Sequence, residues 1–89
     1  MKMSNHAKQR AQQRAIDPLI IEWLLLYGAK KYSNDGAVKR FFDRKSRKRL
    51  ANQVGQRVVR LLGPLLDTVL VQSTAGETVI TVAHRTKRV

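Results

Sequence analysis

Small apolar residues recur at every fourth position near the start of the chain. Ala7, Ala11 and Ala15 follow this spacing, which predicts the narrow apolar side of a helix. Ser4 is a suitable N-cap, because its hydroxyl can accept from a free backbone N–H of the first turn. We therefore expect a first helix that Ser4 caps and that runs to about residue 13 or 14.

A second helix is expected from Pro18 to about Leu26. Asp17 suits the N-cap, and Pro18 suits the first helical position because its missing N–H has no helical partner there. Apart from Glu22 the segment is apolar nearly all round, which is typical of a helix covered on most sides. Gly28 suits the end of this helix.

After the second helix the spacing of apolar residues no longer follows a helical period, and the pattern indicates short strands. Two strands are expected around Lys30–Tyr32 and Ala37–Asp43, joined by a tight turn at Asp35-Gly36. Two further strands are expected at about Leu66–Gln72 and Thr78–His84. The four strands therefore form two consecutive pairs along the chain.

An amphipathic helix is expected between the two strand pairs, from about Ser46 to Leu62. Gly55 lies inside it at a cost of roughly 1 kcal/mol relative to alanine, and Gly63-Pro64 ends it. Apolar residues recur along it at steps of three and four, namely Leu50, Val54, Val58, Leu61 and Leu62.

The element order is helix, helix, strand, strand, helix, strand, strand. It predicts an α+β fold in which the helices pack on one face of a mainly antiparallel four-stranded sheet. A chain of 89 residues is long enough for one modest core, so residues 1–89 are expected to form one domain. Cysteine is absent, which excludes disulfides, thiol catalysis and thiolate zinc sites. With two histidines far apart in the sequence, neither a metal nor another cofactor is expected.

The charge balance is strongly positive, with 18 Lys+Arg against 6 Asp+Glu and a formal net charge of +12. The usual use of such an excess is to meet a polyanion or an acidic protein. The most apolar run, Leu19 to Tyr27, is far shorter than the roughly 20 residues that span a bilayer. The N-terminal residues lack the apolar core of a secretory signal. We therefore expect a cytoplasmic protein with no membrane partner.

The densest charge lies between Lys39 and Arg49, where seven of eleven residues are basic and one is acidic. Cations at the start of a helix oppose the macrodipole, a cost that makes sense if phosphates bind there. The alternative is a solvated charge run that only keeps the protein soluble. Phe41 and Phe42 could stack bases, or one or both could lie in the core. The residues assigned here to nucleic-acid contact are Lys39, Arg40, Arg44, Lys45, Arg47, Lys48 and Arg49.

A second candidate group is His6, Arg10 and Arg14, which a spacing of four places on one helical face. Two guanidiniums can hold phosphates, and the imidazole can transfer a proton near neutral pH. The alternative is an ordinary basic surface helix. Arg10 and Arg14 are accordingly assigned to nucleic-acid contact and His6 to catalysis.

The C-terminal residues form a third group. If Ile80 and Val82 face the helices, His84 lies at the edge of the core and Arg85 emerges on the open face of the sheet. His84 then serves either as a catalytic group or as a satisfied structural histidine. Lys87 shares the side of Arg85 and is assigned to phosphate contact.

Several catalytic motifs are missing from the chain. It has no P-loop, no Gly-x-Ser-x-Gly, no paired acids and no His-Glu-x-x-His. Hydrolysis would then be metal-free, with an RNA 2′-hydroxyl attacking the neighbouring phosphate under acid–base catalysis. The candidate catalytic residues for such a reaction are His6, His84, Arg85 and Tyr32.

Some of these residues form a pattern that spans most of the chain. The segments Ser4-x-His6-Ala7-x-x-Arg10-x-x-x-Arg14 and Val79-Ile80-Thr81-Val82-x-His84-Arg85 resemble a family of small uncharacterised bacterial proteins, which open with a His-x-x-x-Arg-x-x-x-Arg helix. The element order resembles the RelE/ParE-type toxin fold, whose members include ribosome-dependent mRNA endonucleases and gyrase inhibitors. This resemblance implies cleavage residues on the sheet and its edges, and Arg85, His84 and Tyr32 carry over to such positions.

Three functions agree with these features. The first is a small basic RNA-binding protein that acts as a metal-independent, toxin-type endoribonuclease, with RNA favoured over DNA. The second is a non-catalytic nucleic-acid-binding or ribosome-associated module, which needs the same basic surface. The third is a protein whose positive face binds an acidic partner, such as an antitoxin-like protein.

Overall fold

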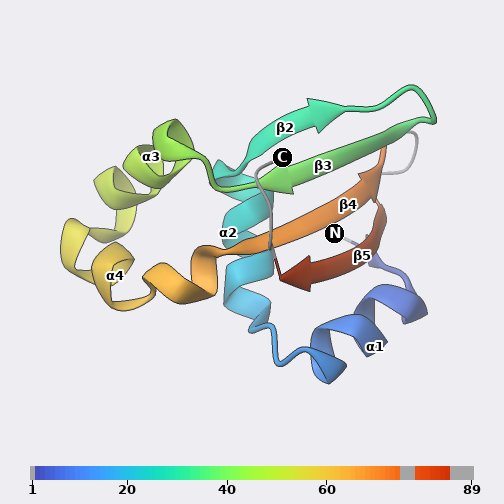
Figure 1. The fold of residues 1–89 in the computed structure, drawn as a ribbon, viewed down its shortest axis with the longest axis horizontal. Coiled ribbons are helices and arrows are strands. Elements are labelled where there is room, and N and C mark those ends of the chain that lie inside the picture. Colours follow the sequence, from blue (N-terminus) through green and yellow to red (C-terminus); the bar gives the residue numbers. More distant parts are fainter. Residues whose placement is uncertain (1, 75–77, 85–89) are drawn as a thin grey trace.

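A computed structural model describes residues 2–74 and 78–84 of the chain (Figure 1). The elements follow the predicted order with three differences: a short strand is added at the start, two helices stand in place of the predicted third helix, and a one-turn 3₁₀ helix precedes the last strand pair. In chain order they are β1 (Lys2–Met3), α1 (Asn5–Gln13), α2 (Pro18–Tyr27), β2 (Ala29–Tyr32), β3 (Ala37–Phe41), α3 (Arg44–Val54), α4 (Gln56–Leu61), η1 (Gly63–Leu66), β4 (Thr68–Ser73) and β5 (Thr78–His84).

The strands form one sheet in the order β1-β5-β4-β3-β2. The four longer strands pair antiparallel, and the two-residue β1 adds a parallel pairing at the β5 edge. Helix α1 packs along β5, while α2 crosses behind β3 and β4, and α3 and α4 lie beyond the end of the sheet (Figure 1). The predicted α+β fold, with helices packed against a mainly antiparallel sheet, is confirmed.

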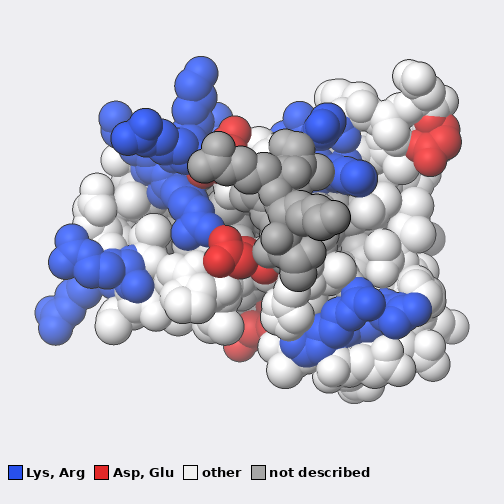
Figure 2. All heavy atoms as spheres, viewed as in Figure 1, with Lys and Arg blue, Asp and Glu red and all other residues white. Residues whose placement is uncertain are grey.

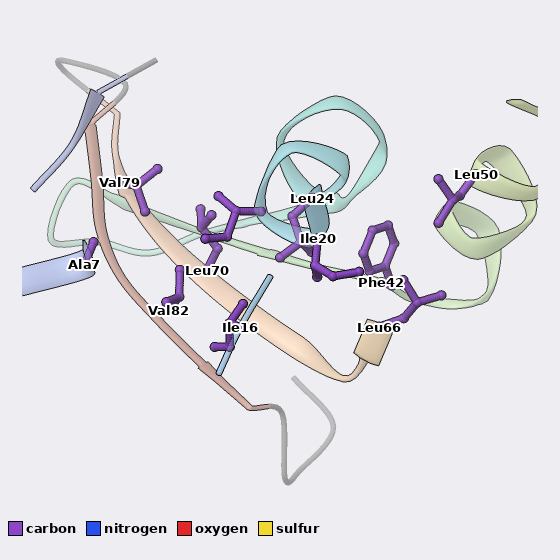
Figure 3. Packing of buried hydrophobic residues seen from close by; sticks show 11 residues of the cluster. Ala7, Ile16, Ile20, Leu24, Phe42, Leu50, Leu66, Leu70, Val79 and Val82 are labelled. Atoms are coloured by element: carbon purple, nitrogen blue, oxygen red, sulfur yellow. The ribbon is translucent and has the colours of Figure 1, made fainter. Parts of the chain in front are cut away.

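The core lies between the sheet and the helices on one face (Figure 3). Leu70 and Val82 are cross-strand partners on this face and are fully buried. Leu24 of α2 covers them, and Phe42 continues the core toward Leu50 of α3. These side chains come from elements far apart in the sequence, and their burial helps to hold the sheet to the helices.

The N-cap side chains of Ser4 and Asp17 fix the first residues of α1 and α2. Ser4 Oγ accepts from the backbone N–H of Ala7 at 3.0 Å, and the Asp17 carboxylate accepts from that of Leu19 at 2.8 Å. Pro18 occupies the first turn of α2, where it removes no helical hydrogen bond. Among the helices of the described ranges, 2–74 and 78–84, none has the length and apolar character needed to cross a bilayer.

The predicted third helix is wrong in its bounds, because it is two helices. Asp43 and Ser46 exchange a reciprocal pair of hydrogen bonds, so α3 begins at Arg44, earlier than predicted. Gly55 has φ +96°, which a residue inside a helix cannot have, and the chain turns there into α4. Leu66 ends the 3₁₀ turn as a fully buried residue, so the next strand starts at Thr68 rather than at Leu66.

A register shift between β4 and β5 decides which residues of the last strand face the core. Leu70 pairs with Val82, but Gln72 pairs with Val79 because the register slips between Val71 and Gln72. Val79 and Val82 are consequently both fully buried, and Ile80 is 41% exposed. The expectation that Ile80 faces the helices is therefore wrong, while the expectation for Val82 is confirmed.

Candidate nucleic-acid interface

Helix α3 presents a cationic side to solvent because its other side is held in the core. Ser46 and Leu50, one helical turn apart, are both fully buried. This orientation leaves Arg44, Lys45 and Lys48 exposed at the first turns of the helix. Spacings of three and four residues make these cations neighbours on the helix surface.

Helix α4 extends this cationic side. Arg57 and Arg60 are exposed and three residues apart, so they share one side of a short helix. Figure 2 shows Lys and Arg side chains gathered over α3 and α4 at one end of the molecule. We call the following set the α3–α4 basic surface: Arg44, Lys45, Lys48, Arg57 and Arg60.

Sequence reasoning missed Arg57 and Arg60, because it followed the densest run of charge. Their signal was present in the expected amphipathic helix. They lie at positions between the apolar residues Val54, Val58 and Leu61 of that helix. The break at Gly55 then redirects this second basic side relative to α3.

The acidic groups near α3 are committed to other partners. The backbone N–H and the hydroxyl of Ser46 donate to the Asp43 carboxylate and hold its pKa below the usual value. Asp67 pairs with Arg47 at 2.8 Å, which is the ion pair found among residues 2–74 and 78–84. Within that part of the chain, the cations of the α3–α4 basic surface therefore have no acidic partner.

Arg40 was expected at the surface, but it is buried at 6% exposure. Its Nη2 donates to the carbonyls of Leu25 at 2.8 Å and Gly28 at 3.3 Å, and its Nη1 donates to Gln72 Oε1 at 3.3 Å. Burial lowers the pKa of the Arg40 guanidinium from its ordinary high value. This location corrects the assignment of Arg40 to surface contact with phosphates.

Arg49 completes the same arrangement from the side of α3. Its Nη2 donates to the carbonyl of Tyr27 at 3.1 Å. Helix α2 has no basic residue in its last turn, so Arg40 and Arg49 together supply the positive charge that its C-terminal carbonyls favour. Arg49 is exposed, but part of its hydrogen-bonding capacity is used in this way.

The predicted row on α1 is divided in the structure. Arg10 Nε donates to His6 Nε2 at 3.4 Å, so these two side chains meet on the exposed side of the helix. Arg14 is the C-cap residue, and its Nη1 instead donates to the carbonyl of Val82 on β5 at 2.9 Å. Only His6 and Arg10 of the predicted row thus remain together at the surface.

His84 takes part in the same contact between α1 and β5. Its Nε2 lies 2.8 Å from the carbonyl oxygen of Arg14, to which it can only donate. His6 lies at the start of α1 and Arg14 just beyond its end, a separation of about 12 Å at the usual helical rise. The structure therefore does not bring His6 and His84 together as an acid–base pair on one phosphate.

The remaining candidates lie on the sheet or outside the described residues. Tyr32 is 67% exposed on the helix side of β2. Lys39 is exposed on the opposite side, where it faces Lys31 across the two strands. Arg85 and Lys87 lie outside the described residues.

The two neighbouring phenylalanines are both buried. Phe42 is 1% exposed in the core, and Phe41 is 8% exposed on the other side of the sheet. Neither therefore offers a surface on which a base could stack. Within residues 2–74 and 78–84, no three His, Asp or Glu side chains come together in a group that could hold a metal ion.

Known proteins offer no relative from which a function could be inferred. No protein-family model, no curated protein and no solved structure matches the chain. Among the described residues, the feature that separates the cations of this chain is whether they have protein partners, as Arg40 and Arg47 do, or none, as Arg44 and Lys48 do.

Proposed function

We propose that this protein binds RNA through the phosphate backbone, with the α3–α4 basic surface as the contact. One observation carries the proposal: Arg44, Lys45 and Lys48 crowd the first turns of a helix, and no carboxylate of the described residues pairs with them. Each like-charge pair at this spacing costs about 0.2–0.5 kcal/mol, and the macrodipole adds about 0.3–1 kcal/mol per cation. Bound phosphates would offset both costs.

The chemistry of the surface favours phosphates over bases. Arg and Lys side chains that lack base-stacking neighbours contact mainly the backbone and position the nucleic acid without choosing its sequence. The two phenylalanines of the basic run are buried and cannot supply stacking. RNA rather than DNA is proposed because the fold that the element order resembles includes ribosome-dependent mRNA endonucleases.

The salt dependence of binding tests this proposal. If the five cations neutralise five phosphates of a single strand, log K falls with log salt at a slope of about −3.5. The variant Arg44→Gln/Lys48→Gln should flatten this slope by about 1.4, since each lost contact removes about 0.7. Fluorescence anisotropy of a labelled single-stranded RNA, with the matching DNA as a second probe, measures both quantities.

A control with the same loss of charge separates a defined surface from a general effect. Lys8 and Lys31 are exposed lysines on α1 and β2, away from α3 and α4. The variant Lys8→Gln/Lys31→Gln should leave the slope near that of the unchanged protein. Equal flattening in both double variants would contradict the proposal. A stable complex with an acidic protein, without salt-sensitive RNA binding, would instead assign the surface to a protein partner.

Metal-independent cleavage of RNA is a second candidate function, and the contact between His6 and Arg10 favours it. His6 Nε2 accepts a hydrogen bond from Arg10, so the exposed imidazole carries a lone pair beside a cation. In the proposed reaction Arg10 turns from His6 to the neighbouring phosphate, which frees the Nε2 lone pair to remove the proton of a 2′-hydroxyl. The 2′-oxygen bonds to phosphorus, the bond to the 5′-oxygen breaks, and that oxygen takes a proton from water, which leaves a 2′,3′-cyclic phosphate and a 5′-hydroxyl.

Incubation of bacterial RNA with the purified protein in EDTA, with and without ribosomes, tests this reaction. His6→Ala should lower the cleavage rate by about 10²–10⁴-fold while RNA binding survives. His84→Ala serves as the comparison, because the ring of His84 is engaged by the Arg14 carbonyl. Intact RNA in every sample, or equal cleavage by the His6→Ala variant, would exclude this role for His6.

A further inference from the structure

A small cavity lies on the helix side of the sheet, away from the α3–α4 basic surface. Its volume is about 140 Å³. Tyr32, Val38 and Gln72 line it from three adjacent strands, as cross-strand partners in one row. The β2–β3 hairpin extends past α2 (Figure 1), and Tyr32 at the β2 end of this row is 67% exposed. Ser73 at the end of β4 and Thr74 directly after it also line the cavity.

Two cations meet at this cavity. Lys30 and Arg40 are direct cross-strand partners and both line it. Like charges directly opposite one another destabilise a strand pair. Arg40 Nε is buried and has no hydrogen-bond partner, and no carboxylate among the described residues pairs with the guanidinium. The oxygens of Leu25, Gly28 and Gln72 balance this charge only with partial negative charges, in a place where water screens it little.

The other polar groups of the cavity can donate hydrogen bonds. Gln72 Oε1 accepts from Arg40, which leaves the amide N–H groups of Gln72 to donate to a ligand. Tyr32 contributes a hydroxyl. The Thr74 hydroxyl already donates to the Gly36 carbonyl at 2.9 Å, so Thr74 holds the rim in place. None of the described residues that line the cavity is acidic.

We propose that this cavity binds a phosphate group, either as inorganic phosphate or as a terminal phosphate monoester. Lys30 contacts the anion as a point charge, the Gln72 amide and the Tyr32 hydroxyl donate to its oxygens, and Arg40 adds the field of a fixed buried charge. A doubly charged terminal phosphate is preferred to an internal phosphodiester, because two cations face one small space. The site is independent of RNA binding at the α3–α4 basic surface.

Adjacent lysines on β2 provide a matched test. Lys30 and Lys31 are both exposed, but successive strand residues point to opposite faces, so only Lys30 lines the cavity. A titration of the labelled protein with inorganic phosphate, followed by amide NMR shifts at Tyr32, Val38 and Gln72, should saturate. Lys30→Gln should weaken this binding about tenfold or more, because a charge-assisted hydrogen bond is lost. Lys31→Gln should change it by less than about twofold.

A second variant tests phosphate binding while keeping the hydrogen-bond acceptor of Arg40, so that a loss of binding is not caused by unfolding. Gln72→Glu retains an acceptor for Arg40 but places a carboxylate in the cavity, so it should preserve the fold and abolish phosphate binding. Equal weakening by Lys30→Gln and Lys31→Gln, or undiminished binding by Gln72→Glu, would overturn the proposal. Shifts that never saturate would do the same.

A pair of RNA oligonucleotides distinguishes the two sources of phosphate. One carries a 5′-phosphate and the other a 5′-hydroxyl, and both are tested in the Arg44→Gln/Lys48→Gln background so that the α3–α4 basic surface contributes little. Tighter binding of the phosphorylated strand, lost with Lys30→Gln, identifies a nucleic-acid end as the ligand. Saturable inorganic phosphate binding with equal affinity for both strands identifies free phosphate. Failure of RNA binding at the α3–α4 basic surface would leave either result unchanged.

Discussion

Arg40 and Lys45 belong to the same basic stretch of the sequence, but the folded protein uses them in opposite ways. Arg40 is buried on the helix side of the sheet, where its guanidinium donates to two carbonyls at the end of α2. Lys45 is exposed in the first turn of α3, where the helix dipole disfavours a cation. The comparison teaches that this chain has two kinds of cation. Structural cations such as Arg40 hold the fold through hydrogen bonds to the protein, and free cations such as Lys45 have no partner among the described residues.

Replacing one cation of each kind should give the largest difference in the free energy of unfolding. Arg40→Ala leaves buried carbonyls and the Gln72 side chain without their donor, and should lower the free energy of unfolding by about 3 kcal/mol. Lys45→Ala should change it by less than about 0.5 kcal/mol. Chemical denaturation of both variants measures the difference. Equal stabilities would mean that Arg40 does not hold α2 to the sheet.

The break between α3 and α4 directs the second half of the α3–α4 basic surface. Gly55 has φ +96° and ψ 147°, a conformation that is nearly restricted to glycine. Gly55→Ala should therefore lower the free energy of unfolding by about 2 kcal/mol. Gly63→Ala is the control, because an added Cβ there meets nothing within 4 Å and the backbone has no positive φ. A neutral Gly55→Ala variant would show that α3 and α4 can join into one helix at little cost.

Asp43, the acid at the start of α3, also stabilises the fold, although it lies among cations. The Asp43 pKa is lowered in the folded protein, so its contribution to stability is complete above the unfolded value of about 3.9. That contribution is lost as the pH falls through the lower folded value. Asp43→Ala should cost about 1 kcal/mol at neutral pH. Asp43→Asn should keep the cap but lose this part of the acid dependence, as followed by unfolding at several pH values.

The smallest expected effect on stability comes from removing one of the free cations. Lys48→Gln removes two like-charge pairs, one with Arg44 and one with Lys45, and should raise the free energy of unfolding by about 0.4–1 kcal/mol. The same variant should weaken RNA binding, so stability and affinity change in opposite directions. Thermal unfolding at low and high salt measures the stability term, which should vanish at high salt. A lower free energy of unfolding would show that Lys48 is one of the structural cations.

Local patterns predicted the elements of the fold well. Ser4 and the pair Asp17-Pro18 mark helix starts that the structure confirms. The bounds of α3 are less well predicted, because the reciprocal cap of Asp43 and Ser46 lies inside a run of basic residues that conceals it. The apolar spacing predicts a helix that continues through Gly55, whereas Gly55 ends α3.

The candidate site was harder to predict, because charge in a sequence does not reveal its partners. Lys39 and Arg40 are neighbours in β3, where successive side chains point to opposite faces of the sheet. Helix α2 lies on the face of Arg40, so Arg40 is buried and Lys39 is exposed. Arg14 shares a helical spacing with His6 and Arg10, but β5 offers it the Val82 carbonyl. In each case the deciding partner lies many positions away in the chain.

The sequence by itself determined the element order, the capping of the first two helices and the large excess of positive charge. These properties depend on side chains and backbone groups within about one helical turn of each other, or on composition alone. Only the tertiary structure decided that Arg40 is buried, that Val79 rather than Ile80 faces the core, and that Lys30 joins Arg40 at a cavity. Strand register determines these outcomes, and a slip of one residue exchanges the two faces of a strand.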